Sequence, residues 1–375
     1  MSPGRRIRVL IVDDSAIVRK VLSEMLASEA DLEVVGTAPD PYVARDRILS
    51  LHPDVLTLDI EMPRMDGLTF LKKLMHFHPM PVVLISSLAP TSCSAAIAAM
   101  ELGGAVEVLA KPGGPYSVGE LRPVLLEKIR AVAQSNQAIR PSAAAAAQLP
   151  LAPPAARPTA IRQDVLIAIG ASTGGTEAVA SIVRQLPAGM PPILVVQHIP
   201  PVFSRAFAQR LNQISSLDVK EAEDGDRLVP GRVLVAPGDY HMMLQPDTRG
   251  LWVQVRGGPR ICYQRPSVDV LFLSVAEIAG RRAVGVLLTG MGEDGAKGLL
   301  KMRQSGAQTL IQDEATSVVF GMPGAALKLG AAEHVVGLPA IPQRLVSMRS
   351  WPARAGRIRT WYSAWAEIRA ALRSG

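Results

Sequence analysis

Short apolar runs alternate with segments of helical periodicity along the first 134 residues. Continuous runs rich in Val, Leu and Ile predict strands that are buried on both faces, as in parallel sheets. A helical segment follows each run, and the last of these spans about 118–134. This β/α repeat predicts a doubly wound parallel sheet. The five predicted strands are Arg8–Val12, Leu32–Thr37, Val55–Leu58, Val82–Ile85 and Val106–Leu109.

A second region shows the same alternation after an interruption rich in Ala and Pro. Apolar runs at Val165–Ile169, Ile193–Val196 and Val284–Leu288 predict further buried parallel strands. Near the end of the chain, Trp361 and Trp365 recur at helical spacing with arginines around them, which predicts an amphipathic helix. We therefore expect a first domain at 1–134, a linker at 135–162, a second domain at 163–345 and a basic amphipathic tail at 346–375.

The chain of 375 residues has a net charge of +7, and the location of this excess decides what it means. Residues 131–162 contain three arginines and no acidic residue, and residues 351–375 contain five arginines and one glutamate. The excess thus lies mostly in the linker and the tail. Because no basic stripe marks either folded domain, we expect no nucleic-acid binding.

The two cysteines, Cys93 and Cys262, form no metal-binding pattern, and we expect both to be reduced. The apolar run near the N-terminus stops at Asp13, which is too early for a signal-peptide core. No run of about 20 apolar residues predicts a membrane span. We therefore expect a cytoplasmic protein without membrane insertion.

Polar residues follow four of the first five strands. Asp13 and Asp14 come after the first strand, Asp59 after the third, Ser86 after the fourth and Lys111 after the fifth. The carboxyl ends of parallel strands meet at one edge of a sheet. Three carboxylates gathered there repel one another unless a cation joins them, and hard Mg²⁺ suits their oxygens. The alternative, that these acids are helix caps and surface charges, explains one such residue more easily than five.

This pattern resembles the response-regulator receiver domain over residues 7–134. The resemblance implies that a histidine kinase supplies the phosphoryl group for Asp59, and that Asp13 and Asp14 help Asp59 to hold Mg²⁺. It also implies that Ser86 senses the phosphoryl group and that Lys111 contacts it. Receivers often carry an aromatic residue three positions before this lysine, where this chain has Val108.

Three candidate catalytic residues follow strands of the second domain: Ser172 in a glycine-rich loop, His198 in Val-Gln-His, and Asp294 in Thr-Gly-Met-Gly-Glu-Asp-Gly. A serine, a histidine and an aspartate at one sheet edge can form a nucleophilic triad. In such a triad Ser172 is the nucleophile, His198 the general base and Asp294 the residue that fixes the imidazole tautomer. Backbone N–H groups around Met291 are candidates for an oxyanion hole. His241 could also line the site, but it ranks second because His198 directly follows an apolar strand.

The loop Gly170–Gly175 has other interpretations. It satisfies the G-x-S-x-G pattern of α/β-hydrolases, although that fold orders its triad Ser, acid, His, whereas the order here is Ser, His, Asp. It is a poor dinucleotide loop, because Ser172 replaces the middle glycine and the next strand ends without an acidic residue for the ribose. A purely structural glycine turn, with Ser172 or Thr173 as a helix cap, stays open at this point.

Taken together, the two domains resemble the protein-glutamate methylesterases of chemotaxis over about residues 7–345. The resemblance implies a flavodoxin-like receiver joined to a Rossmann-like α/β hydrolytic domain with the triad Ser172, His198 and Asp294. It implies hydrolysis of glutamate methyl esters on the cytoplasmic domains of chemoreceptors, with release of methanol, and deamidation of receptor glutamines. Phosphorylation would activate this chemistry, which needs no cofactor of its own. The alternative is a response regulator whose second domain is a non-catalytic partner-binding module.

Overall fold

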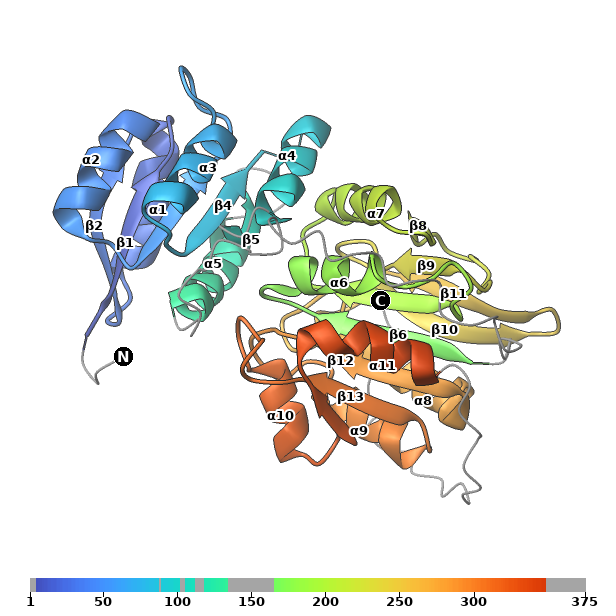
Figure 1. The fold of residues 1–375 in the computed structure, drawn as a ribbon. Helices are drawn as coiled ribbons and strands as arrows, with labels where there is room; N and C mark the ends of the chain where they lie inside the picture. Colours follow the sequence, from blue (N-terminus) through green and yellow to red (C-terminus); the bar gives the residue numbers. More distant parts are fainter. Residues whose placement is uncertain (1–4, 88, 102–104, 112–117, 134–164, 349–375) are drawn as a thin grey trace. The chain divides into compact units, whose positions relative to one another are not determined.

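The structure is a computed structural model that describes residues 5–87, 89–101, 105–111, 118–133 and 165–348 (Figure 1). The chain divides into two compact units, residues 1–153 and 154–375, which we call the N-terminal and C-terminal units. The predicted linker at 135–162 and the predicted tail helix around Trp361 lie outside the described residues. Among the described helices, none combines the length and the apolar character needed to cross a bilayer.

The N-terminal unit is built on a parallel five-stranded sheet in the order β2-β1-β3-β4-β5. This is the flavodoxin-like strand order, in which ligands bind where the order reverses, between β1 and β3. Each predicted strand is present, and its bounds differ from the prediction by one residue at most at either end. The elements are β1 (Ile7–Val12), α1 (Ala16–Ala27), β2 (Leu32–Ala38), α2 (Pro41–Leu51), β3 (Val55–Asp59), α3 (Gly67–Phe77), β4 (Val82–Ser86), α4 (Pro90–Glu101), β5 (Ala105–Ala110) and α5 (Val118–Ala133).

Local chemistry fixes the segment between β3 and α3. Asp66 caps α3, because its carboxylate accepts a hydrogen bond from the Thr69 N–H at 2.8 Å. The next residue, Gly67, lies so close to β3 that a Cβ there would stand 2.0 Å from the Asp59 carbonyl oxygen. Only glycine allows this approach, and so α3 begins directly beside the residue that ends β3.

The C-terminal unit contains a parallel seven-stranded sheet in the order β14-β13-β12-β6-β7-β9-β8, and a separate antiparallel ribbon of β10 and β11 (Figure 1). The fold class, two α/β units with parallel sheets, is confirmed, whereas the ribbon was not predicted. The strands are β6 (Leu166–Ala171), β7 (Ile193–Gln197), β8 (Asp218–Glu221), β9 (Arg232–Val235), β10 (His241–Asp247), β11 (Gly250–Arg256), β12 (Ala283–Leu287), β13 (Gln308–Gln312) and β14 (His334–Val336). The helices are α6 (Gly175–Val183), α7 (Phe203–Ile214), α8 (Val268–Ile278), η2 (Gly280–Arg282), α9 (Ala296–Gln304), α10 (Met322–Lys328), η3 (Leu338–Ala340) and α11 (Ile341–Met348).

Helix α8 joins the ribbon to the parallel sheet. It packs against α9, against β10 and against β6, and its apolar residues Leu271, Phe272 and Val275 are fully buried in a core of this unit. Close approach makes glycine necessary here as well, since a Cβ on Gly170 would stand 2.2 Å from the Val268 side chain. The start of α8 is thereby pressed against the end of β6, which bears on the site below.

The sheet order brings three strand ends together. β6 lies between β12 and β7, and the chain leaves β6 toward β7 on one side and returns to β12 on the other. A ligand crevice is expected at such a reversal, outside the carboxyl ends of the strands. These are the ends that carry the segments with Ser172, His198 and Asp294.

Candidate functional site

The acidic residues of the N-terminal unit converge at the carboxyl ends of β1 and β3. Asp13 and Asp59 are fully buried, while Asp14 is exposed. Their carboxylate oxygens lie within 4.8 Å of one another. The backbone fixes two of these carboxylates, since Ser15 N–H donates to Asp13 at 2.8 Å and Glu61 N–H donates to Asp59 at 3.0 Å.

Lys111 joins this group from the end of β5. Its Nζ lies 2.6 Å from Asp59 Oδ2 and 3.8 Å from Asp13 Oδ2. Burial raises the pKa of the Asp59 carboxyl to about 6 and outweighs the hydrogen bond from Lys111, while the charge of Asp13 adds to the rise. Asp59 is therefore a buried carboxylate whose charge is incompletely compensated.

The donor set of this cluster suits a hard divalent cation. Asp13 Oδ2 is buried, and it accepts no hydrogen bond from the described residues. Asp13, Asp14 and Asp59 offer only carboxylate oxygens, which are the ligands that Mg²⁺ prefers. The structure brings these three predicted residues together at one edge of the sheet.

Ser86 ends β4 beside the same edge. It is fully buried, its hydroxyl donates to the Ser87 carbonyl at 3.1 Å, and its own carbonyl accepts from the Lys111 N–H at 2.9 Å.

Sequence reasoning missed Glu61, whose carboxylate accepts hydrogen bonds from the hydroxyls of Ser87, at 2.8 Å, and Ser92. Glu61 thus ties the loop after β3 to the start of α4.

The register of β6 and β7 brings Ser172 and His198 side by side in the C-terminal unit. Ala171 pairs with Gln197, so Ser172 and His198 are the next residues on two strands about 4.8 Å apart. The His198 N–H donates to the Ala171 carbonyl at 3.1 Å, and the Gln197 amide donates to the Ser172 carbonyl at 2.9 Å. Both candidates are almost completely buried.

Asp294 reaches the same place from the loop between β12 and α9. Its Oδ2 lies 2.8 Å from His198 Nε2 and accepts from the Val268 N–H at 2.7 Å. Its Oδ1 accepts from the Ser267 hydroxyl at 2.8 Å and from the Asp269 N–H at 3.0 Å. Burial alone would raise the pKa of Asp294, but the hydrogen bonds from His198 and from the first turn of α8 lower it below its usual value.

These contacts fix the tautomer of His198. An ionised Asp294 can only accept, so His198 Nε2 carries the proton of the bond between them. The other ring nitrogen, Nδ1, is buried and has no hydrogen-bond partner among the described residues. His198 therefore offers Nδ1 as a proton acceptor, which is the state that a general base beside Ser172 requires.

Some backbone N–H groups around Met291 donate to other parts of the fold, whereas others are available to a ligand. The Ser172 N–H donates to the Thr289 carbonyl, and the Gly290 N–H donates to the Val319 carbonyl, both at 3.0 Å. Within the described part of the chain, no hydrogen bond from the Met291 N–H is present. A Cβ on Gly290 would stand 2.7 Å from the Ser172 Cβ, so this turn is pressed against the serine. The Met291 N–H is thus an available donor of that turn.

His241 does not share the position of His198. It begins β10, is fully buried and uses both ring nitrogens, since Nε2 lies 2.8 Å from the Pro259 carbonyl and Nδ1 accepts from the Ser267 N–H at 3.2 Å. Sequence reasoning also missed Ser267, which caps α8 and bonds Asp294. A serine directly before an apolar helical run is the signal that could have identified it as a cap.

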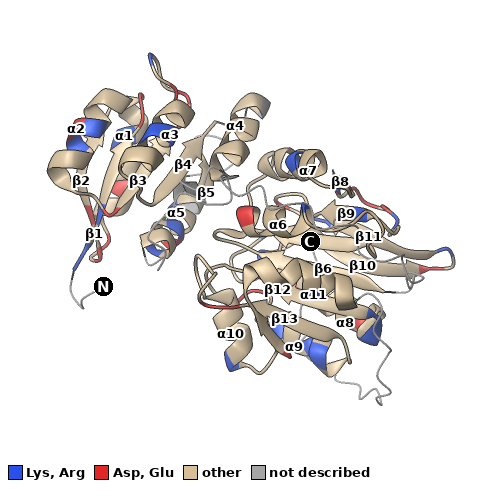
Figure 2. Ribbon diagram, in the orientation of Figure 1, with Lys and Arg blue, Asp and Glu red and all other residues tan. Residues whose placement is uncertain are grey.

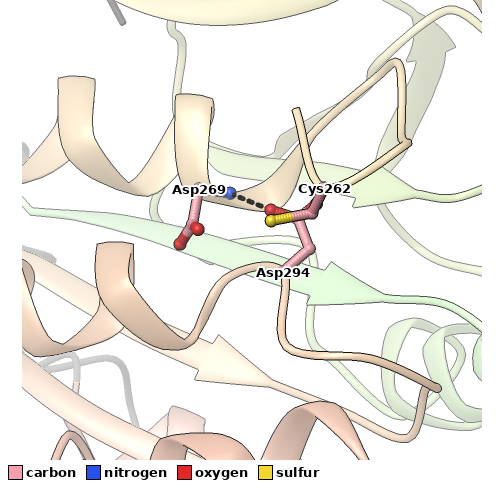
Figure 3. A group of neighbouring side chains, drawn as sticks. All are labelled: Cys262, Asp269 and Asp294. Atoms are coloured by element: carbon pink, nitrogen blue, oxygen red, sulfur yellow. Dashed lines mark hydrogen bonds between the residues drawn. The ribbon is translucent and has the colours of Figure 1, made fainter. Parts of the chain in front are cut away.

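A second group of possible metal ligands surrounds Asp294. Figure 3 shows Cys262, Asp269 and Asp294 converging from three segments, with the hydrogen bond from the Asp269 N–H to Asp294 dashed. Burial and the charge of Asp294 raise the pKa of Asp269 to about 7. Because each oxygen of Asp294 already accepts two hydrogen bonds, this carboxylate is engaged, and the group is better explained as part of the support of the site.

Charged residues are interspersed over the described part of both units, with blue and red positions mixed along the ribbon in Figure 2. Several pair locally, such as Arg265 with Asp239 and Arg130 with Asp31, each at 2.7 Å.

Two family models match the chain, one on each unit. The response regulator receiver domain matches residues 9–120, and CheB methylesterase matches residues 167–345. The first match contains the acidic cluster of the N-terminal unit, and the second contains the three strand ends of the C-terminal unit.

Curated relatives are similar along nearly the whole chain. A protein-glutamate methylesterase/protein-glutamine glutaminase of Syntrophus aciditrophicus is 52% identical over 343 residues, which cover 92% of this chain and 99% of the relative. The protein of that name from Escherichia coli K12 is 48% identical over 344 residues, covering 91% and 97%. The crystal structure of the Thermotoga maritima CheB methylesterase catalytic domain is 40% identical, covers 49% of this chain and 98% of that chain, and has a TM-score of 0.48.

Proposed function

The chain belongs to the protein-glutamate methylesterase/protein-glutamine glutaminase family, and we infer that it carries both activities of that name. The substrates proposed are glutamate methyl esters and certain glutamines on the cytoplasmic domains of chemoreceptors. The alternative, a non-catalytic partner-binding domain, is not supported, because relatives that cover over 90% of the chain are named as enzymes.

We propose a nucleophilic mechanism on Ser172. Its hydroxyl oxygen attacks the ester carbonyl while the proton passes to Nδ1 of His198, and the Met291 N–H stabilises the resulting oxyanion. The proton then leaves with methanol, and a water activated by His198 hydrolyses the acyl-enzyme to glutamate. A glutamine side chain offers the same carbonyl, with ammonia as the leaving group. The observation that carries this proposal is the hydrogen bond between His198 Nε2 and Asp294, which leaves Nδ1 as the base.

We also propose that residues 1–134 control residues 163–345 through phosphorylation of Asp59. A histidine kinase is the proposed donor, Asp13, Asp14 and Asp59 would hold Mg²⁺, and Lys111 would contact the phosphoryl group. Bound Mg²⁺ would supply positive charge beside the transferred oxygens. The family match of residues 9–120 and the oxygen-only donor set support this role. The location proposed is the cytoplasm, where the receptor domains and the kinase meet the enzyme.

The deciding experiment measures methanol release from methylated receptor membranes by wild type and Ser172→Ala, with and without Mg²⁺ and a small phosphodonor. Loss of a triad serine should lower the rate by roughly 10⁴–10⁶-fold. Equal release by both proteins would refute the Ser172 mechanism. Asp59→Ala should keep basal release and lose stimulation, and stimulation that survives in this variant would refute control through Asp59.

A further inference from the structure

Asp294 is held by a chain of buried polar groups formed by residues other than Ser172 and His198. His241 Nε2 bonds the Pro259 carbonyl, and His241 Nδ1 bonds the Ser267 N–H. The Ser267 hydroxyl then bonds Oδ1 of Asp294, whose Oδ2 faces His198. His241 and Ser267 are both completely buried, so no solvent replaces these contacts.

The partners of His241 allow one arrangement of protons. A carbonyl oxygen can only accept and a backbone N–H can only donate, so His241 is neutral, with its proton on Nε2. Protonation would set a second N–H against the Ser267 N–H. Burial lowers the pKa of His241 and outweighs the hydrogen bond to the Pro259 carbonyl and the charge of Asp294, which raise it.

The Ser267 hydroxyl orients the Asp294 carboxylate through its hydrogen bond to Oδ1. The Val268 and Asp269 donors are backbone N–H groups, and His198 is the group to be oriented. Ser267 Oγ also caps α8 through the Val270 N–H, but this contact is 3.4 Å long, against 2.8 Å to Asp294. The shorter bond holds Oδ1, which leaves Oδ2 directed at His198 Nε2.

We propose that Ser267 and His241 are positioning residues of the esterase reaction, acting through Asp294 to keep His198 Nε2 protonated and Nδ1 directed at the Ser172 proton. This inference rests on the proposed function of Ser172, His198 and Asp294. Loss of the Ser267 hydroxyl would let the carboxylate rotate and would misalign the base. A misplacement of about 1 Å can cost about 10²-fold in rate.

A matched control separates positioning from packing. Ser274 lies on the same helix, is fully buried, accepts from the Leu244 N–H at 2.9 Å and donates to the Leu271 carbonyl at 2.7 Å. Ser274→Ala therefore also removes a buried hydroxyl that joins α8 to other backbone, but it leaves Asp294 untouched. A role of Ser267 in folding alone predicts the same result for both variants.

The experiment compares full-length wild type, Ser267→Ala, Ser267→Thr and Ser274→Ala, each with Mg²⁺ and a small phosphodonor. The kcat and KM of methanol release are measured on methylated receptor membranes, and the rate at which a fluorophosphonate labels Ser172 is measured by mass spectrometry. In the labelling step the Ser172 oxygen bonds phosphorus, fluoride leaves, and the proton passes through His198. We expect Ser267→Ala to lower kcat and the labelling rate by about 10–100-fold with little change in KM.

Ser267→Thr, which keeps the hydroxyl, should recover most of kcat, and Ser274→Ala should keep both rates. His241→Leu should lower kcat as Ser267→Ala does, whereas His241→Asn keeps an acceptor for the Ser267 N–H and should lose less.

Equal kcat and labelling rates for Ser267→Ala and Ser274→Ala would overturn the proposal. If receptor membranes release no methanol with wild type, the substrate assignment fails while the labelling series still decides the role of Ser267. If wild type shows neither reaction, Ser172 is not the nucleophile and the positioning role falls with it.

Discussion

Asp59 and Asp294 are two buried carboxylates at the ends of parallel sheets, and their surroundings push their pKa values in opposite directions. Asp59 accepts one backbone N–H and the Lys111 ammonium, and it lies beside the charge of Asp13. Asp294 accepts four hydrogen bonds, two of them from backbone N–H groups at the start of α8. Burial raises the pKa of Asp59 to about 6, whereas the bonds to Asp294 overcome the same effect and lower its pKa.

The difference indicates two uses of a buried carboxylate. Asp294 has no oxygen lone pair to spare for a reacting group, and this suits a residue that holds another side chain in place. Asp59 has a charge that is only partly compensated, and this suits a residue that gains a cation and a phosphoryl group. The number of donors, and not burial alone, separates the two roles.

The largest effect on the reaction rate is expected from neutralising Asp294, the carboxylate that accepts four hydrogen bonds. Asp294→Asn replaces one acceptor with an amide donor, so the contact with His198 Nε2 favours the wrong tautomer. We expect kcat for methanol release to fall by about 10³–10⁴-fold. Asp269→Asn is the matched control, because Asp269 is buried beside Asp294, has a pKa raised to about 7 and makes no contact with His198. A similar loss in both variants would mean that the local charge, and not the His198 contact, matters.

The strands that carry both carboxylates could be predicted from the sequence. The runs at Val55–Asp59, before the first site, and at Leu166–Ala171 and Ala283–Leu287, before the second, have a local signature, because strands covered on both faces are mostly hydrophobic. The candidate residues directly follow such runs, so topology alone places Ser172 near His198. Asp294 follows its strand after a longer loop, and its approach to His198 depends on how that loop folds.

The supports of Asp294 could not be predicted in this way. The contact between Ser267 and Asp294 joins residues from different segments, and it depends on α8 packing against the end of β6. From the sequence, His241 in the segment Ala236–His241 is only a second-ranked candidate to line the site. Its actual contacts depend on the antiparallel ribbon, which was not predicted although Pro246, Asp247 and Gly250 offer a turn signal between its two strands.

A smaller effect on kcat is expected from disturbing the close packing between Gly290 and Ser172. Gly290→Ala places a Cβ 2.7 Å from the Ser172 Cβ and 2.3 Å from the Met322 sulfur, so the serine must move. We expect kcat to fall by about 10–100-fold while stimulation by phosphodonor keeps its ratio. Gly257→Ala, where a Cβ meets nothing within 4 Å, serves as the control and should retain full activity. An unchanged kcat in Gly290→Ala would mean that the loop can shift without disturbing Ser172.

The smallest effect concerns the pH dependence of stability. Its sign should differ for the two carboxylates, because folding raises the pKa of Asp59 and lowers that of Asp294. The pKa of Asp59 is about 6 when folded and 3.8 in the ordinary state, so between these values the folded chain binds more protons than the unfolded chain. Stability therefore falls as the pH rises from about 4 to 6, and the ionised Asp59 destabilises the receiver at neutral pH. Asp59→Asn removes this penalty and should stabilise the receiver by about 1–2 kcal/mol at pH 7–8.

This gain should shrink toward zero near pH 4, where the wild-type carboxyl is protonated as well. Amide hydrogen exchange of β1 and β3 measures it within the full chain, because exchange there reports on the opening of the receiver alone. Asp66→Asn is the control, since the hydrogen bond from the Thr69 N–H lowers the pKa of this cap and asparagine caps helices equally well. Its exchange should not slow at any pH. Faster exchange in Asp59→Asn at pH 7–8 would mean that the Lys111 ion pair outweighs the burial of Asp59, and the contrast with Asp294 would then disappear.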